Sequence, residues 1–490
     1  MARKTLFNTT EESNFILNMT EEKYSELASK ALFLTCILGT LFTVPYELSD
    51  NVGFSIVSGG LAVCGVICMI FALIAVMKKY ITKKMLVPVG AFGALTLWSL
   101  FSSINAFEFG TAFYGTDGRG EGLLTTIFYF CIFITAMTIK GKKRINLLSD
   151  SLVAVGFINS FWALLQLLID SFKNNYRAVP LSTLSKDENG IIAPSKDTIH
   201  AVSGLAHSPI FLAALLTIAL TVSLIGVLIN ENKTRRILYS VSAILMTFIS
   251  VFTYSLLGWV GLGAAIIIAV VTAFVKKAPK KRLVSVGLAA VAPVLSIVLI
   301  TAGAFGIYSK YSLHDGPLMW RDSWFRLDCS GSYNTPDVRE DMTVLDDTKY
   351  VYGYMNGHTA KIVKRYPLLG TGPENLIYAM VYENIYMPDG EIVITGESGV
   401  SNEGTFDKCY NEYLYIAATR GIPSLIALLA VIISVMAAAV GKLKKKSSDN
   451  TYIALCVTAS TAVIFLVGTS SIAFAPIFWA FAGMCVGNDE

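Results

Sequence analysis

The stretch GFSIVSGGLAVCGVICMIFALIAVMKKYITKK (53–84) decides the fold class. Residues 53–77 carry no charged side chain, and a helix of that length crosses the hydrocarbon core of a bilayer. The turn that follows, 78–84, holds four lysines. A lysine-rich turn after an apolar run is typical of the cytoplasmic end of a transmembrane helix. The stretch therefore predicts a membrane-spanning helix that ends in the cytoplasm.

The composition of the whole chain agrees with this stretch. Of 490 residues, 54% are hydrophobic and 15% are charged, and the mean hydropathy is +0.59. A soluble globular protein carries charge on about a quarter of its residues. We therefore expect an all-α polytopic membrane protein, with the lipid bilayer as a partner. The net charge of +4 is small and gives no reason to expect a nucleic-acid partner.

Apolar runs recur along the chain, and we expect twelve of them to form transmembrane helices. The predicted helices cover 28–46, 53–77, 85–106, 122–139, 147–169, 203–229, 237–253, 256–275, 284–307, 421–440, 452–468 and 471–487. They divide the chain into an N-terminal tail, a nine-helix part, one long loop and a three-helix part. The bounds of these four parts are 1–27, 28–307, 308–420 and 421–490.

Short basic turns set the predicted orientation. Five of them occur at every second connection and hold about half of the chain's Lys and Arg residues. By the positive-inside rule, these turns and both termini lie in the cytoplasm. The turns are KKYITKK (78–84), KGKKR (140–144), NENKTRR (230–236), KKAPKKR (276–282) and GKLKKK (441–446).

The opposite loops are then extracytoplasmic, and 308–420 is by far the longest. Because so long a connection without a fold of its own is unusual, we expect it to contain short helices on the outer face of the membrane. Cys329 and Cys409 share this loop, and the sequence leaves open whether they form a disulfide. All four histidines lie in the outer loops or at their membrane edge, so any chemistry is expected outside: His200, His207, His314 and His358.

The outer loops carry polar clusters that topology alone does not require. In FYGTDGRGEGLLTTIFYF (113–130), Arg119 is interpreted either as an interfacial anchor or as a contact for a phosphorylated headgroup. In KRYPLLGTGPENLIYAM (364–380), a glycine turn precedes a helix predicted to start at Glu374. That turn lacks the Gly-Lys-Ser/Thr of a phosphate loop, so nucleotide binding is not predicted.

Two further clusters lie where helices are predicted to begin. In HAVSGLAHSPIFLAALL (200–216), Ser208 and Pro209 are a favourable N-cap and first residue. In DKCYNEYLYIAATRGIPSLI (407–426), Asn411 as N-cap and Arg420 as a positive charge at the helix C-terminus explain the polar residues structurally. The alternative is a short helix that lines an outer-face site.

Together these segments resemble the O-antigen ligase/polymerase family, in the same order and over roughly residues 90–440. The family consists of bacterial integral-membrane glycosyltransferases, similar to type C glycosyltransferases, that use polyprenyl-diphosphate-linked sugars. The resembling segments are YGTDGRGEGLL (114–124), SGLAHSPIFLAALL (203–216), SLLGWVGL (255–262), YPLLGTGPENL (366–376) and DKCYNEYLYIAATRGIPSLI (407–426).

The sequence departs from the family pattern at three positions. Tyr410 stands where the family has the histidine taken as the acceptor-activating base, Leu256 replaces an arginine, and Ala201 stands where an arginine is frequent. A phenol with a pKa near about 10 is a poor base at neutral pH. Either another group such as His200, His358 or Glu412 takes the proton, or little base assistance is needed, or this chain is inactive.

The resemblance implies transfer or polymerisation of a polyprenyl-diphosphate-linked oligosaccharide onto a glycan, lipid or protein acceptor. The reaction would serve cell-surface polysaccharide assembly on the outer face of the bacterial cytoplasmic membrane. Arginine suits the diphosphate leaving group because its planar fork pairs with phosphate oxygens. The catalytic candidates are Tyr410, Asn411, Glu412 and His200, and the substrate-binding candidates are Arg119, Arg321, Arg326, Arg365, Gly370, Gly372 and Glu374.

No metal or other cofactor is expected, because arginines can stabilise the leaving group and the outer loops show no tight carboxylate cluster. Two alternatives to the enzyme are an inactive glycan-binding or assembly subunit of the same family and a lipid-glycan transporter. A transporter usually has ionisable residues within its spans or an inverted repeat, and the sequence shows neither clearly.

Overall fold

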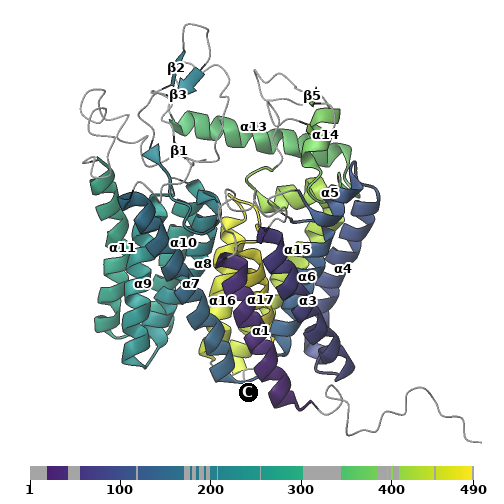
Figure 1. The fold of residues 1–490 in the computed structure, drawn as a ribbon. Helices are drawn as coiled ribbons and strands as arrows, with labels where there is room; N and C mark the ends of the chain where they lie inside the picture. The colour runs from purple at the N-terminus through teal and green to yellow at the C-terminus, as the bar shows by residue number, and fades with distance from the viewer. Residues whose placement is uncertain are drawn as a thin grey trace, which may run out of the picture.

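The structure is a computed structural model. It describes residues 19–41, 56–116, 120–169, 177–178, 184–186, 192–194, 199–206, 208–253, 255–301, 344–383, 394–395, 399–400, 408–445 and 448–487. These residues form a bundle of long helices, and further helices lie across one end of it (Figure 1).

Within these ranges, eight helical segments are long and apolar enough to cross a membrane. The helices that hold them are α3 (Ile56–Met77), α4 (Leu86–Ile104, preceded by the 3-10 turn η2, Lys83–Met85), α7 (Lys142–Leu168), α8 (Pro209–Ile229), α9 (Lys233–Val251), α10 (Leu256–Val275), α11 (Lys280–Thr301) and α15 (Glu412–Lys445). This confirms the prediction of an all-α, multi-pass membrane fold.

The remaining predicted spans also coincide with helices, but these are shorter or less apolar. They are α1 (Glu21–Leu41), α6 (Leu123–Thr138), α16 (Asp449–Ile464) and α17 (Ala475–Val486). The number of twelve spans therefore stays a prediction. In α15 the short polar helix expected before Gly421 and the span expected from residue 421 are continuous as Glu412–Lys445, with a kink at Gly421 between them.

Helix α8 lies at the centre of one half of the bundle. In its apolar window 94% of the residues are buried, compared with 28% in α11, which leaves most of α11 for contact with lipid. Helix α10 packs closely on α8 because Gly261 faces Thr217: a Cβ added at Gly261 would lie 1.8 Å from Thr217 Oγ1. Small residues at such contacts are typical of helix packing in membranes.

Helix α15 changes direction at Gly421. The glycine has φ 82° and ψ 162°, and a Cβ there would lie 1.9 Å from the carbonyl oxygen of Leu368. Only glycine accommodates both the positive φ and the close backbone approach. Pro423 follows at a position where the helix restarts, and Ile422 N–H donates to the carbonyl of Pro367 (2.8 Å) instead of to its own helix. The kink thus separates 412–420 from the long apolar part of α15.

The two ends of the bundle differ in chemistry. At the α13 end lie α5 (Phe109–Tyr114), α13 (Val344–Arg365) and α14 (Leu376–Tyr382), with α13 running across the helix ends (Figure 1). Short antiparallel strand pairs occur in two connections. Between α7 and α8, β1 (Arg177–Ala178) pairs with β4 (Ile199–His200) and β2 (Leu184–Lys186) with β3 (Ile192–Pro194); between α14 and α15, β5 (Ile394–Thr395) pairs with β6 (Gly399–Val400).

The basic turns lie at the opposite end of the bundle, which we call the basic end. Contacts between the turns and the neighbouring helix ends hold it together. The contacts are Tyr24 with Tyr80, Lys140 with Glu21, Arg235 with Asp150, Lys276 with Asp449, Arg282 with the Leu228 carbonyl, and Lys442 with the Gly487 carbonyl.

Candidate functional site

Three segments that are distant in sequence converge at the α13 end of the bundle. Thr371 N–H donates to the Ala418 carbonyl (3.0 Å) and Gly372 N–H to the Thr419 carbonyl (2.8 Å), which fixes the glycine turn on α15. The third segment, the loop before α6, is attached to that turn because Thr116 N–H donates to Glu374 Oε2 (3.1 Å). The polar stretches that sequence analysis singled out separately thus form one structure.

Gly370 and Gly372 allow this close approach. Both have positive φ values, 68° and 101°. A Cβ on Gly370 would lie 2.5 Å from the backbone carbon of Thr419, and one on Gly372 would lie 2.3 Å from Ala106 Cβ. Both glycines are buried, so their observed contribution is to the packing of the loops. Their role in substrate binding stays a prediction.

A buried lysine holds the three segments together. Lys408 Nζ lies 2.6 Å from Glu121 Oε2 and 3.4 Å from Glu374 Oε1, and the three side chains are only 8%, 7% and 2% exposed. Lys408 also donates to the Ser470 carbonyl (3.3 Å), and Tyr415 OH donates to Glu374 Oε1 (3.4 Å). A buried charge is tolerated only when it is paired and hydrogen-bonded, as Lys408 is here.

Glu412 is the next carboxylate of this centre and is 6% exposed. Its backbone N–H donates to the carbonyls of Phe465 and Gly468 (both 2.9 Å), which positions the side chain on the turn between α16 and α17. Glu412 Oε2 accepts the backbone N–H of Ser470 (2.8 Å), and the Ser470 hydroxyl donates to Glu121 Oε1. Ser470 therefore bridges Glu412 and Glu121.

Arg420 lies on the same side of α15 and is 9% exposed. Its guanidinium donates from Nη1 to Thr126 Oγ1 (2.9 Å) and from Nη2 to the Glu121 carbonyl (3.3 Å). Among the described residues no carboxylate lies within 4 Å of it. The interpretation of Arg420 as a simple charge at the helix end is wrong, because the kink at Gly421 turns its side chain into the bundle.

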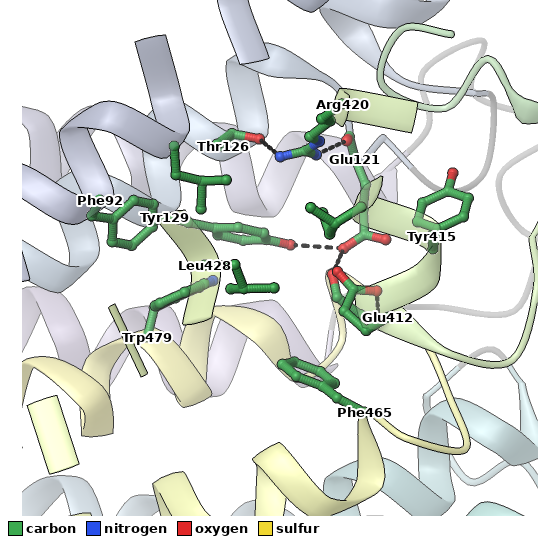
Figure 2. A pocket seen from close by; sticks show the side chains of 13 residues that line it. Phe92, Glu121, Thr126, Tyr129, Glu412, Tyr415, Arg420, Leu428, Phe465 and Trp479 are labelled. Atoms are coloured by element: carbon green, nitrogen blue, oxygen red, sulfur yellow. Dashed lines mark hydrogen bonds between the residues drawn. The ribbon is translucent and has the colours of Figure 1, made fainter. Parts of the chain in front are cut away.

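These residues border a cavity between α4, α6, α15 and α17 (Figure 2). It has about 40 Å³ of space for water, enough for about three molecules. Its outer part is polar, and its deeper part is lined by apolar side chains. The polar lining residues include Glu121, Thr126, Glu412, Arg420 and Ser470, and the apolar ones include Phe92, Leu95, Leu428, Phe465 and Trp479.

The other two resembling segments lie side by side on the far side of the α16–α17 turn. Ser208 caps α8 through a bond from Ile210 N–H (3.3 Å), with Pro209 at the first helical position, as predicted. Val202 N–H donates to the carbonyl of Phe252, the C-cap of α9 (3.1 Å), which joins this segment to the turn that precedes α10. Gly468 packs against Leu257, so the α10 start also reaches the turn that positions Glu412.

The remaining catalytic candidates lie apart from the cavity or at its edge. Asn411 is the N-cap of α15: its Oδ1 accepts Leu414 N–H (3.0 Å) and its Nδ2 donates to the Leu466 carbonyl (3.3 Å). Tyr410 is half-buried against a small core beneath α13 that includes Met355 and Ile362. His200 belongs to β4, opposite Arg177. Of the catalytic candidates, the structure brings Glu412 into the polar centre.

The arginine candidates are not gathered there. Arg119, Arg321 and Arg326 lie outside the described residues, as does Cys329, so a disulfide with Cys409 stays a hypothesis. Arg365 ends α13 with a side chain that is 68% exposed, and its Nε lies 3.4 Å from Glu383 Oε1. Cys409 itself is buried, and burial raises the pKa of its thiol to about 12, which keeps it protonated.

Sequence reasoning missed several residues of the centre. It expected no tight carboxylate cluster, but Glu121, Glu374 and Glu412 gather around Lys408 and Ser470. Glu121 and Lys408 could have been noticed as charges beside the resembling motifs, whereas nothing marks Ser470. No group of three potential metal ligands is placed to hold an ion within the described part of the chain. The sequence matches no known protein family and no curated protein.

Proposed function

We propose that this protein transfers or polymerises a polyprenyl-diphosphate-linked oligosaccharide, in the manner of the O-antigen ligase/polymerase family that its segments resemble. The observation that carries the proposal is the convergence of three such segments on one buried polar centre. The hydrogen bonds of Thr116, Thr371 and Gly372 join these segments, and this supports the proposal.

The position of the centre fits a reaction outside the cytoplasm. The polar centre lies at the α13 end of the bundle, and the basic turns lie at the opposite end, where ion pairs hold them to neighbouring helices. By the positive-inside rule the basic end, where Glu21 and Gly487 lie, faces the cytoplasm of a bacterial cell, and both termini would lie in the cytoplasm as well. The donor would approach from the outer leaflet, where polyprenyl diphosphates present their glycans.

In the proposed reaction an acceptor hydroxyl oxygen forms a bond to the anomeric carbon of the donor sugar. The bond from that carbon to the diphosphate oxygen breaks, and its electron pair leaves with the lipid diphosphate. The growing negative charge is stabilised by outer-face arginines, for which Arg119, Arg321, Arg326 and Arg365 are the candidates. The acceptor is a glycan, a lipid or a protein hydroxyl.

The test is an assay of purified protein in lipid nanodiscs with a polyprenyl-diphosphate oligosaccharide and an excess of free acceptor glycan. Wild type should form longer glycan and release polyprenyl diphosphate in equal amounts. Arg119→Ala should lower the rate by about 100-fold, the usual cost of one preorganised donor to a leaving oxyanion. Lys361→Ala is the matched control, because Lys361 is an exposed cation of α13.

Two results would contradict the proposal. Release of polyprenyl diphosphate without a glycan product would identify a hydrolase. Binding of the donor without turnover would identify an inactive glycan-binding subunit, the reading motivated by Tyr410 in place of the family histidine.

A further inference from the structure

The charges of the polar centre are not evenly paired. Lys408 contacts both Glu121 and Glu374, and Glu121 also accepts bonds from the hydroxyls of Tyr129 (3.3 Å) and Ser470. Glu374 accepts from Thr116 N–H and Tyr415 OH. Both oxygens of each carboxylate therefore have hydrogen-bond donors.

Glu412 is the exception. Its Oε2 accepts one backbone N–H, from Ser470, and its Oε1 has no hydrogen-bond partner among the described residues. Glu412 is only 6% exposed, yet among the described residues no lysine or arginine nitrogen lies within 4 Å of its carboxylate. A buried carboxylate without a cation or donors to both oxygens readily takes up a proton.

A second unsatisfied group faces the same cavity. Arg420 Nε is buried and has no hydrogen-bond partner in the described part of the protein. A buried N–H without a partner costs about 1–3 kcal/mol, and the cavity has room for water. Water in the cavity would accept from Arg420 and donate to Glu412, which satisfies both groups.

We infer that Glu412, acting through a cavity water, is the base that accepts the proton of the acceptor hydroxyl, at a site where this chain has lost the family histidine. The inference rests on the proposed glycosyl transfer. As the acceptor oxygen bonds to the anomeric carbon, its O–H bond breaks and the proton passes to the water. The water gives a proton to Glu412 Oε1, and product release returns that proton to solvent. Arg420 keeps its charge and takes no part in the proton transfer.

The groups that surround Glu412 belong to four elements. The ionisable ones are Glu121 and Tyr129 from the α6 segment, Glu374 from the glycine turn, and Lys408, Cys409, Tyr413, Tyr415 and Arg420 from the α15 segment. The α16–α17 turn contributes only Ser470 and backbone groups. A pH dependence that is lost when Glu412 is substituted, and kept when one of these neighbours is substituted, is therefore due to Glu412.

The first measurement is the pH profile of glycan transfer by the full chain in nanodiscs. Wild-type turnover should fall as acid protonates Glu412, with a slope of one proton. Glu412→Gln should lower turnover by about 100-fold or more and remove this acid limb, the usual size of a general-base effect. Glu412→Asp should recover part of the rate and restore the acid limb. Glu22→Gln, which removes an exposed carboxylate at the basic end, should match wild type.

The second measurement does not depend on turnover. Infrared difference spectra of the protein without donor should contain a carboxylic-acid C=O band that disappears as pH rises. The band should be absent from Glu412→Gln and present in Glu22→Gln and Tyr129→Phe.

The outcomes separate the two proposals. Transfer by Glu412→Gln within about threefold of wild type, or an unchanged acid band in that variant, would overturn the role of Glu412. If the band behaves as expected but wild type makes no glycan, the proposed function fails and the proton-binding site stands without its catalytic role.

Discussion

The two ends of the bundle use the same kind of ion pair in different surroundings. At the basic end, Arg235 lies 2.5 Å from Asp150 with side chains 26% and 43% exposed, and Lys276 lies 3.1 Å from Asp449 with 20% and 41% exposed. At the α13 end, Lys408 lies 2.6 Å from Glu121, and both side chains are less than a tenth exposed. The distances are alike, whereas access to water differs several-fold.

Because of this difference in exposure, the ion pairs at the two ends have different roles. A pair in contact with water contributes at most about 1 kcal/mol, because solvent screens it and ordering two long side chains costs entropy. A buried pair contributes little over an apolar replacement, but removing one partner strands the other charge. The pairs at the basic end therefore fasten helix ends, while Lys408 determines where three loops meet.

The largest expected effect follows from removing the buried cation. Lys408→Met leaves the buried Glu121 and Glu374 without their shared cation, and should lower the free energy of unfolding by about 3–5 kcal/mol. Thermal unfolding in detergent, followed by intrinsic fluorescence, measures the loss. The matched variant Lys276→Met at the basic end should lose about 1 kcal/mol or less. Equal losses in the two variants would abolish the distinction between the ends.

The next effect concerns the kink that directs Arg420 inward. Gly421→Ala places a methyl group in a backbone region open almost only to glycine and against the Leu368 carbonyl, so stability should fall by about 2 kcal/mol or more. Gly441→Ala is the control, because nothing lies within 4 Å of its Cβ position and alanine favours a helix. If Gly421→Ala proved as stable as wild type, the kink would not hold the polar segment in place.

A smaller effect is expected at the basic end. Asp150 accepts Arg235 Nε (3.0 Å) and Tyr239 OH (2.6 Å). Asp150→Asn should cost about 1 kcal/mol, because Arg235 stays in contact with solvent and the amide oxygen of Asn can still accept from the buried Tyr239. The loss should shrink further in high salt, which screens exposed charges. A loss as large as that of Lys408→Met, or one insensitive to salt, would place this pair in the buried class.

The smallest expected effect is the pH dependence of stability that the half-buried His358 contributes at the α13 end. Burial and the nearby Lys361 lower the pKa of the half-buried His358 from 6.5. Since the unfolded chain then binds the proton more readily, the contribution of His358 is present above about pH 6.5 and lost as pH falls toward the lower folded value. His358→Gln should lose this pH dependence and leave the unfolding temperature at about pH 8 nearly unchanged. A stability curve for His358→Gln parallel to that of wild type below pH 6.5 would assign the pH dependence to other groups.

The sequence predicted the helices and helix caps, because these depend on residues that are close together along the chain. Apolar runs and basic turns located the helices, Ser208 and Asn411 were recognised as caps, and each depends on residues within a turn or two. Lys408 and Glu121 are 287 residues apart, and no local pattern states that they meet. The sign of their charges was visible, but their pairing depends on how α6 and α15 pack.

The interpretation of Arg420 failed for a related reason. Before a Gly-Ile-Pro break, a terminal arginine normally lies in water or among headgroups. Here the break is a kink within a longer helix, and the long-range contacts of Gly370 and Gly421 with backbone atoms direct the residue inward. Ser470 carried no signal because its contribution depends on a backbone N–H and a hydroxyl that meet carboxylates from two other segments.

The kink at Gly421 also allows the two parts of α15, 412–420 and 422–445, to be oriented independently. The orientation of 412–420 is set by hydrogen bonds to the loops, so the lipid-facing residues beyond the break, such as Ile426 and Ile433, need only be apolar. Exchanging one aliphatic side chain for another there leaves the hydrophobic length of the helix unchanged, and the polar segment keeps its register. A single glycine thereby separates the packing demands of the apolar part of the helix from those of its hydrogen-bonded part.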